Sequence, residues 1–497
     1  MGKPGAFLAH GRKVHELRPA AERVHDYDEL YRELDCGERR VQASRCMMCG
    51  VAFCQAGHPF GRARSSGCPL HNLIPEWNDL VWRGRWREAA ERLALTSPLP
   101  EFTSRVCPAP CEAACNLGSV EGEPTAIHDT ERAISDWEWE HGGPAAFDAA
   151  GADAPRVAVV GSGPAGLACA WELARTGVRV TVVERSDRPG GLLMYGIPNM
   201  KLPKDIVERR CALMEERGIS FMLNTDAADP AVAAELASAY DAVVIACGAG
   251  AARTLDVPGI DAAGVTIAVD YLTSSTRAVL DKAAPAIDAR GLDVVVIGGG
   301  DTGNDCVGTA VRQGARSVRQ LEVMPEPPEQ RDPGNPWPEW PNVKKTDYGQ
   351  QEAIELMGGE MRSWSVDTRA VLVDDDGRVR ALKIVDVDWS EGSPAPVAAT
   401  ERELPAQLVL IACGFTGPQR SVVEALGATV PEPGAGRQLP VMAEAGSHRC
   451  ACAAGAVEPA HGVWACGDAR SGASLVVNAI ADGVACAREV TDALGAR

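Results

Sequence analysis

Seven cysteines lie between residues 46 and 115, and thiolates at this spacing could bind a metal. Four form an early group and three form a later one. The total is one thiolate short of the eight that two four-ligand clusters would need. The early group is Cys46, Cys49, Cys54 and Cys68, and the later group is Cys107, Cys111 and Cys115.

Zinc and iron–sulfur clusters are the two alternatives for these cysteines. Zinc sites close with four ligands, which usually come in pairs. The run Cys46-x2-Cys49-x4-Cys54 instead presents three thiolates close together, with Cys68 remote, and three plus one is common for cubane clusters. A cluster also accepts single electrons, which structural zinc cannot do. The pattern therefore favours iron–sulfur clusters.

The remaining cysteines are predicted to be structural, because several lie in apolar runs where cysteine acts as a small hydrophobic residue. Cys450-x-Cys452 is too isolated to indicate a metal site. His58 and His71 lie among the cluster cysteines and are candidate ligands, although histidines in loops are mostly solvated. The structural group is Cys36, Cys169, Cys211, Cys247, Cys306, Cys413, Cys450, Cys452, Cys466 and Cys486.

A glycine-rich nucleotide fingerprint follows the cysteine region. It comes directly after the apolar run 157–160, which predicts a buried parallel strand, and it opens a predicted helix at 167–175. The glycines allow a tight turn, a close approach to a pyrophosphate and close helix packing. An acid about 20 residues further on can bind ribose hydroxyls. The site predicted here is Gly161, Gly163, Pro164, Ala165, Gly166 and Glu184.

A second unit of the same kind begins at the apolar run 293–297. Its second strand ends in Glu322, with no arginine directly after it. A carboxylate there would bond a ribose 2′-hydroxyl and repel a 2′-phosphate, which favours NADH over NADPH unless Glu322 points elsewhere. The predicted site is Gly298, Gly300, Asp301, Thr302, Gly303, Asn304 and Glu322.

The C-terminal region indicates which unit holds flavin. A strand ending in Gly467-Asp468, followed by a helix, resembles the closing motif of disulfide-reductase-type and adrenodoxin-reductase-type flavoproteins, in which the aspartate contacts the flavin ribityl chain. Gly191-Leu192 resembles the flavin-facing loop of the same proteins. The resemblance implies FAD at the first fingerprint and NADPH or NADH at the second. The flavin contacts implied are Gly191, Leu192, Gly467, Asp468, Ser474, Leu475 and Val476.

Two strand–turn–helix units in one chain predict an α/β fold with two Rossmann-like domains. A mostly helical iron–sulfur domain is expected over 1–150. The FAD domain is expected over 151–290 and 415–497, and the NAD(P)H domain over 291–414. The second nucleotide domain is thus inserted in the first, in an adrenodoxin-reductase-like arrangement.

The composition excludes some partners. The 497 residues include 49 Lys plus Arg and 68 Asp plus Glu, a net charge of −19. So acidic a chain argues against nucleic acid or an anionic membrane as a partner. No apolar run approaches the roughly 20 residues of a membrane helix, and the N-terminus has no signal-like segment. A cytoplasmic location is expected.

The cysteine and nucleotide motifs together resemble the small (β) subunit of bacterial glutamate synthase. The resemblance lies in the runs 45–54, 67–78 and 106–112, in Gly300-Asp301-Thr302-Gly303 and in Gly467-Asp468. The run 333–341 resembles the NADH-type enzyme, in which both subunits are fused. The family implies that a reduced nicotinamide delivers hydride to FAD. Electrons then pass through 4Fe-4S clusters to a large α subunit, which makes two glutamates from glutamine and 2-oxoglutarate at FMN.

Hydride transfer depends on stacked rings and positioning, so no catalytic acid or base is predicted. If the nicotinamide binds the second domain, a rotation of that domain is expected to bring it to the flavin. The alternatives are a stand-alone NAD(P)H:acceptor reductase, for example one serving a ferredoxin, and a non-catalytic zinc-bearing assembly subunit.

A similarity to the N-terminal half of dihydropyrimidine dehydrogenase addresses the missing eighth ligand. In that family the clusters interleave, and one has a non-cysteine ligand. Carried over, this implies one cluster on Cys46, Cys49, Cys54 and Cys115, and another on Cys68, Cys107, Cys111 and Glu131. The pyrimidine enzyme has an amide where this chain has Glu131, and a solvated helix position is the alternative for this glutamate.

Overall fold

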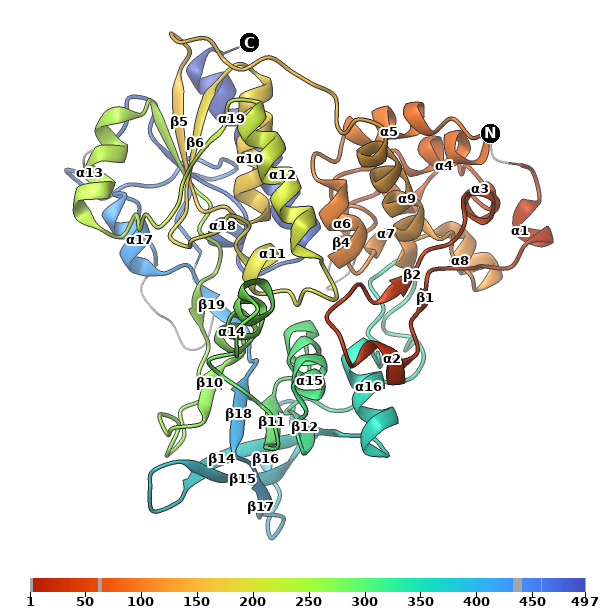
Figure 1. The fold of residues 1–497 in the computed structure, drawn as a ribbon, viewed down its shortest axis with the longest axis vertical. Coiled ribbons are helices and arrows are strands. Elements are labelled where there is room, and N and C mark those ends of the chain that lie inside the picture. The colour runs from red at the N-terminus through yellow and green to blue at the C-terminus, as the bar shows by residue number, and fades with distance from the viewer. Residues whose placement is uncertain (1–2, 61–64, 432–439, 457, 497) are drawn as a thin grey trace.

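The structure is a computed structural model, and it describes residues 3–60, 65–431, 440–456 and 458–496. Figure 1 shows three parts: a helical N-terminal region, a parallel sheet with helices beside it, and a second parallel sheet below both. The predicted α/β class, with one nucleotide-binding unit inserted in another, is confirmed. Among the described residues, no helix is long and apolar enough to cross a membrane.

The N-terminal part is built from short helices that surround the cysteine loops. The first of the larger helices starts at an aspartate cap, since the Asp35 carboxylate accepts a hydrogen bond from the Glu38 amide at 2.9 Å. The longest helix here buries Ile127 and Ile134 on one face. The helices are α1 (Ala6–Ala9), α2 (Ala20–Arg23), α3 (Cys36–Ser44), α4 (Ile74–Trp82), α5 (Trp86–Ala94), α6 (Pro100–Val106), α7 (Pro110–Ala113), α8 (Asn116–Glu121) and α9 (Ile127–Glu140).

The first sheet is entirely parallel, in the order β20-β8-β5-β6-β7. Side chains of its central strand alternate between two cores, as a period of two requires. Val157 and Val159 face α10 (Pro164–Arg175) and α19 (Val476–Leu494), while Ala158 and Val160 face α13 (Pro230–Ala239) and α17 (Arg420–Ala425). The strands are β5 (Arg156–Val160), β6 (Arg179–Val183), β7 (Ser220–Met222), β8 (Ala242–Ile245) and β20 (Val463–Ala465).

The second sheet is also parallel, in the order β10-β18-β11-β12-β13. Helices α14 (Ala268–Asp281), α15 (Asp301–Gln313) and α16 (Tyr348–Met357) cover one face, and an antiparallel sheet covers the other. The parallel strands are β10 (Val265–Ile267), β11 (Asp293–Ile297), β12 (Ser317–Glu322), β13 (Arg362–Trp364) and β18 (Leu408–Ile411). The antiparallel strands are β14 (Val366–Val373), β15 (Val379–Asp388), β16 (Ala395–Pro396) and β17 (Arg402–Pro405).

The expected start of the inserted domain at 291 needs correction. Strand β10 pairs with β18 of the second sheet, and α14 packs in the same core, so 265–281 belongs to the inserted unit. Three half-buried residues are too short a strand to be recognised in the sequence, and the partner strand lies more than a hundred residues away. The chain crosses between the units at β9 (Ala251–Ala252) and β19 (Phe415–Gly417), which pair with each other.

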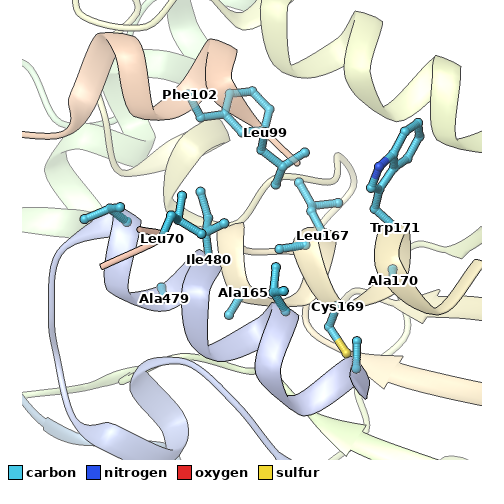
Figure 2. Packing of buried hydrophobic residues seen from close by; sticks show 14 of the residues in the cluster. Leu70, Leu99, Phe102, Ala165, Leu167, Cys169, Ala170, Trp171, Ala479 and Ile480 are labelled. Carbon is cyan, nitrogen blue, oxygen red and sulfur yellow. The ribbon is translucent and has the colours of Figure 1, made fainter. Parts of the chain in front are cut away.

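One apolar core joins the N-terminal helices to the first nucleotide unit. Figure 2 shows Leu99 and Phe102 of the helical region near Leu167 of α10 and Ile480 of α19. Glu101 and Arg210 form an ion pair across this boundary, with both side chains fully buried. The cysteine loops are therefore held rigidly against the first unit.

Candidate redox and nucleotide sites

The seven cysteines gather around two cavities, which we call the outer and inner cavities. The outer cavity is lined by Cys46, Cys49, Cys54 and Cys115. Local structure brings them together: Cys46 and Cys49 follow the end of α3, Cys54 lies in a 3-10 turn at Phe53–Gln55, and Cys115 precedes α8.

The inner cavity is lined by Cys68, Cys107, Cys111 and Glu131. Cys107 ends α6, Cys111 lies in α7 and Glu131 is on the buried face of α9. Cys68 follows Gly67, where φ is 76° and an added Cβ would lie 2.4 Å from the Phe53 carbonyl oxygen. The two cavities thus contain the two interleaved sets that the family resemblance implied.

Burial favours the protonated form of five of these thiols. It raises the pKa of Cys46 and of Cys68 to about 12. It also raises the pKa values of Cys54, Cys107 and Cys111 well above their ordinary value. Four buried or half-buried sulfur or oxygen donors around one space suit a cationic centre, whose charge compensates the thiolates. The residues present therefore fit an iron–sulfur cluster in each cavity.

Glu131 is buried, with 6% of its surface exposed, and its Oε1 accepts a hydrogen bond of 2.7 Å from the Thr103 hydroxyl. Burial raises the pKa of this carboxyl to about 7. A buried carboxylate aimed at three cysteines does not match the alternative of a solvated helix position. Thr103 and His128, which also line the inner cavity, were not identified from the sequence, because nothing in their spacing distinguishes them.

His58 and His71, the other candidate ligands, lie outside both linings. His71 is exposed, and its Nδ1 lies 3.0 Å from the Gln55 carbonyl oxygen. Cys169, Cys466 and Cys486, predicted to be structural, lie fully buried between α10, β20 and α19, with their sulfur atoms within 4.8 Å of one another.

The two cavities are adjacent, and the inner one faces the first nucleotide unit. Ile74 and Ile127 line both cavities, so a single layer of side chains separates them. Val477, in the first turn of α19, lines the inner cavity. The residues before it, 474–476, are those that the resemblance assigns to flavin.

The first glycine turn has the geometry of a dinucleotide site. Gly161 has φ of 109°, and a Cβ added there would lie 2.4 Å from the Ala246 carbonyl oxygen. A Cβ on Gly166 would lie 2.0 Å from the Gly161 carbonyl oxygen, whereas a Cβ on Gly163 would enter open space. The backbone at Gly163 is therefore open to a ligand, and Pro164 starts α10 directly after it.

Glu184 directly follows β6, beside this turn. Its carboxylate accepts hydrogen bonds from the Ser162 amide at 3.1 Å and the Ser162 hydroxyl at 2.5 Å. A cavity lined by Gly161, Glu184, Asp226 and Cys247 opens next to it. This is the carboxyl end of the parallel strands, where nucleotides bind in such folds.

Segments far apart in the sequence converge on the same turn. A Cβ on Gly191 would lie 2.9 Å from the Gly163 Cα atom, and one on Gly467 would lie 2.5 Å from the Ala165 Cβ atom. Asp468 accepts hydrogen bonds from the Ser474 amide and hydroxyl, at 3.2 and 2.8 Å. Burial raises the pKa of Asp468 to about 6. Leu192, Leu475 and Val476 lie on the same segments and are partly exposed.

The second glycine turn repeats this geometry. Gly298 has φ of 121°, and a Cβ on Gly303 would lie 2.4 Å from the Gly298 carbonyl oxygen. Glu322 ends β12 beside the turn and accepts a hydrogen bond of 2.7 Å from the Gly299 amide. The backbone at Gly300 is open, and Asp301 and Thr302 begin α15 after it.

The side chain of Asn304, which was predicted to contact the nucleotide, is hydrogen-bonded within the protein instead. Its buried side-chain oxygen accepts hydrogen bonds from the Gly349 and Gln350 amides, at 3.0 and 3.1 Å. It therefore holds the first turn of α16, because its place in α15 faces the protein interior.

Two family profiles match this chain. Residues 155–334 match the pyridine nucleotide-disulphide oxidoreductase family, and residues 23–143 match dihydropyrimidine dehydrogenase domain II, 4Fe-4S cluster. Together with the two glycine turns and the cysteine-lined cavities, they define an NAD(P)H-dependent oxidoreductase with flavin and iron–sulfur centres.

Curated relatives give the particular family. The glutamate synthase [NADPH] small chain of Bacillus subtilis is 42% identical, over 99% of this chain and 98% of its own length. That of Mycobacterium tuberculosis is 43% identical, over 99% and 96%. The chain belongs to the glutamate synthase small-chain family. Glutamate synthase [NADH] of Schizosaccharomyces pombe is 42% identical over 99% of this chain, which spans only 23% of that relative.

Proposed function

We propose that this chain is the electron-input subunit of a glutamate synthase. It oxidises NAD(P)H at FAD and supplies electrons, through two 4Fe-4S clusters, to a large FMN-containing subunit. That subunit makes two glutamates from glutamine and 2-oxoglutarate. The observation that carries the proposal is the continuous arrangement of the first glycine turn, α19, the inner cavity and the outer cavity. A cytoplasmic location follows, since reduced thiols persist there.

FAD accepts a hydride and releases its electrons singly, which connects a nicotinamide to one-electron centres. In this proposal Gly161, Gly163 and Gly166 hold its pyrophosphate, Glu184 holds a ribose, and Asp468 holds the ribityl chain. Their convergence around α10 and α19 supports this assignment. We leave no role for a protein acid or base.

The order of the centres follows from the side chains between them. Val477 lines the inner cavity and directly follows residues 474–476, which we assign to flavin, while Ile74 and Ile127 are shared between the inner and the outer cavity. An inner cluster would be held by Cys68, Cys107, Cys111 and Glu131 and an outer one by Cys46, Cys49, Cys54 and Cys115, and each would supply one-electron transfer between the flavin and the large subunit. The outer cavity is where we place the exit to the large subunit.

The rim of the outer cavity supports this exit. Val51 and Val120 are each 70% exposed, and the side chain of Asn116, which lines the outer cavity, donates a hydrogen bond of 3.2 Å to the Val51 carbonyl oxygen. Large apolar side chains this exposed often mark a protein interface. The partner we assign to it is the large subunit, the part of the longer relatives that this chain does not span.

The nicotinamide is proposed to bind at Gly298, Gly300 and Gly303, with Glu322 on its adenine ribose. Relatives of equal identity carry NADPH and NADH in their names. The Glu322 carboxylate beside the turn favours NADH, because it would repel a 2′-phosphate.

The test is a reconstitution of this chain with the large subunit of its own organism. A visible spectrum with flavin bands on a broad iron–sulfur shoulder is expected, and so is NAD(P)H-dependent glutamate formation from glutamine and 2-oxoglutarate. Ferredoxin reduction without formation of such a complex would support the stand-alone reductase instead. A colourless protein would support the zinc-bearing assembly subunit.

The role of Glu131 has its own test. Glu131→Ala is expected to lower the iron content from about eight to about four atoms per chain, since two cubane clusters hold four irons each. Glu131→Gln keeps an oxygen ligand and is expected to retain more iron. Glu138→Ala is the matched control, because Glu138 lies on the same helix but lines neither cavity. A full iron content in Glu131→Ala would remove this residue from the ligand set.

A further inference from the structure

The junction between the two nucleotide units has the form of a hinge. The chain enters and leaves the second unit through the paired strands β9 and β19. Gly248 and Gly414 flank these strands with φ of 70° and 80°. Such a junction would let the second unit rotate, as the sequence led us to expect.

A buried ion triad opposes this rotation. Glu352 of α16 is fully buried between two guanidinium groups. Its Oε1 accepts from Arg23 Nε at 2.5 Å, and its two carboxylate oxygens accept from Arg312 at 2.5 and 3.0 Å. Arg312 belongs to the second unit, whereas Arg23 belongs to α2 (Ala20–Arg23) in the N-terminal part. Rotation of the second unit would separate Arg23 from Glu352, and a buried charge that loses its partner is strongly unfavourable.

The segment 18–30, which we call the N-terminal strap, also binds the first unit. The Leu30 amide donates to the Met200 carbonyl oxygen at 3.0 Å, and the Asn199 side chain donates to the Tyr27 carbonyl oxygen at 2.8 Å. On its other side, Arg312 Nε donates to the Asp26 carbonyl oxygen at 3.0 Å. The strap therefore connects both nucleotide units.

A second ion pair extends this network to the two nucleotide loops. Lys201 Nζ lies 3.1 Å from Asp305 Oδ1, and the Tyr348 hydroxyl donates to the same oxygen at 3.0 Å. Lys201 follows the loop that carries Gly191, and Asp305 lies two residues after Gly303. The Tyr348 carbonyl oxygen accepts from Arg23 at 3.3 Å, so the two ion clusters are joined.

The run 333–341 adds a contact between the second unit and the iron–sulfur part. The Trp337 ring packs edge-on against Phe53, with ring centroids 4.9 Å apart, next to Cys54. The Ser66 hydroxyl donates to the Pro338 carbonyl oxygen. The second unit is thus held at several separate places.

We propose that Glu352 is a positioning residue for hydride transfer. By pairing with Arg23 and Arg312, it holds the second unit in one orientation against the flavin unit, so turnover proceeds without the rotation that the hinge would permit. This inference rests on the proposed function, in which a nicotinamide on the second unit reduces a flavin on the first. Glu352 touches neither cofactor site and acts through the orientation of α15 and α16.

The experiment compares Glu352→Gln with wild type in anaerobic stopped-flow reduction of the flavin by NADH and by NADPH. The rate constant for flavin reduction is expected to fall about tenfold, which corresponds to about 1.4 kcal/mol on the barrier. Reduction of the clusters by dithionite is expected to be unchanged. Hydrogen exchange of β9 and β19 is expected to be faster in the variant, as the hinge is released.

Glu403→Gln is the matched control, because Glu403 forms an exposed ion pair with Arg380 in the same unit. It is expected to match wild type in every measurement. Arg23→Lys keeps the charge but loses the planar guanidinium, and it serves as a second variant if Glu352→Gln does not fold. It is expected to slow flavin reduction less than tenfold.

The outcomes separate the two proposals. If neither nicotinamide reduces the flavin of the wild-type protein, the proposed function fails. If wild type is reduced and both Glu352→Gln and Arg23→Lys are reduced at the same rate, only the positioning role is overturned. A lowered thermal midpoint with an unchanged flavin reduction rate would likewise assign Glu352 to stability alone.

Discussion

The two glycine turns are almost the same local structure in two different surroundings. Each follows a buried parallel strand, starts with a glycine at φ above 100° and ends with a glycine that no Cβ could replace without meeting a backbone oxygen. In each, a glutamate at the end of the next strand accepts a hydrogen bond from the amide after the first glycine. The structure of the turn therefore indicates a dinucleotide site but does not distinguish flavin from nicotinamide.

The surroundings distinguish them. The first turn is enclosed by Gly191 and Gly467, and α19 leads from it to the inner cavity. The second turn is bordered by α16, whose first amides bond Asn304 just after the turn, and the two cysteine-lined cavities include none of its residues. In the proposed function, position relative to the cysteine loops distinguishes the turn that we assign to flavin, next to the inner cavity, from the turn that we assign to the nicotinamide.

The largest effect is expected from adding a methyl group at the last glycine of either turn. Gly166→Ala places a Cβ 2.0 Å from a backbone oxygen, and Gly303→Ala places one at 2.4 Å. Overpacking of this kind costs about 3 kcal/mol where backbone must move. Gly166→Ala is expected to yield protein without flavin, while Gly303→Ala keeps flavin but is not reduced by NAD(P)H. Flavin content and flavin reduction are the measurements.

The controls are Gly163→Ala and Gly300→Ala, whose Cβ atoms would enter open space. Both should fold normally, since only the approach of a ligand is obstructed. Loss of flavin in Gly303→Ala with retention in Gly166→Ala would reverse the assignment of the two turns.

Asp468→Ala tests the C-terminal segment that packs against the first turn and, among the described residues, has no counterpart at the second. Removing the carboxylate that Ser474 bonds is expected to weaken flavin binding by about tenfold to a hundredfold, the loss of one or two good hydrogen bonds to a charged group. Flavin released on dilution is the measurement. Asp301→Ala, at the corresponding end of the second turn, is the comparison and should leave flavin binding unchanged.

Glu322→Ala tests the acid of the second turn. Without the carboxylate, a 2′-phosphate is no longer repelled, so the ratio of kcat/KM for NADPH over NADH is expected to rise about tenfold, or about 1.4 kcal/mol. Steady-state rates with both nucleotides measure it. A wild-type enzyme that already prefers NADPH would contradict our interpretation of Glu322.

The smallest effect concerns a charged network behind the first turn. His448 contacts Asp482 at 3.2 Å and Glu489 at 2.5 Å, and Asp482 accepts from the Gly467 amide. Burial opposes the charged imidazole, but these two carboxylates raise the pKa of His448 above its ordinary value. Its stabilisation is complete below the unfolded pKa, near 6.5, and is lost as pH rises through the higher folded pKa.

His448→Asn is therefore expected to destabilise the protein more at pH 6 than at pH 9, by about 1 kcal/mol. Denaturant unfolding at both pH values measures the difference. His461→Asn, at a histidine outside this network, is the control, and an equal loss for His448→Asn at both pH values would rule out a charged imidazole.

Much of this architecture was accessible from the sequence. Both glycine turns, their acids and the insertion of one unit in the other follow from short apolar runs and glycine spacing, because these features act over a few neighbouring residues. The start of the inserted domain did not follow, since β10 is three residues long and pairs with β18 far along the chain. Asn304 was assigned to the nucleotide for its place in the motif, yet its side chain accepts hydrogen bonds from amides in the first turn of α16.

The sequence by itself determined which chemistry is present: cysteines for clusters and glycine turns for nucleotides, since residue type and local spacing are sufficient for these. Only the tertiary structure decided how they connect. It put the cysteines into two adjacent cavities, directed Glu131 into the inner one, and placed Val477, at the start of α19, in the lining of that same cavity. It also showed Arg23 meeting Glu352 more than three hundred residues away. Such contacts depend on burial of distant segments against one another, which no local pattern encodes.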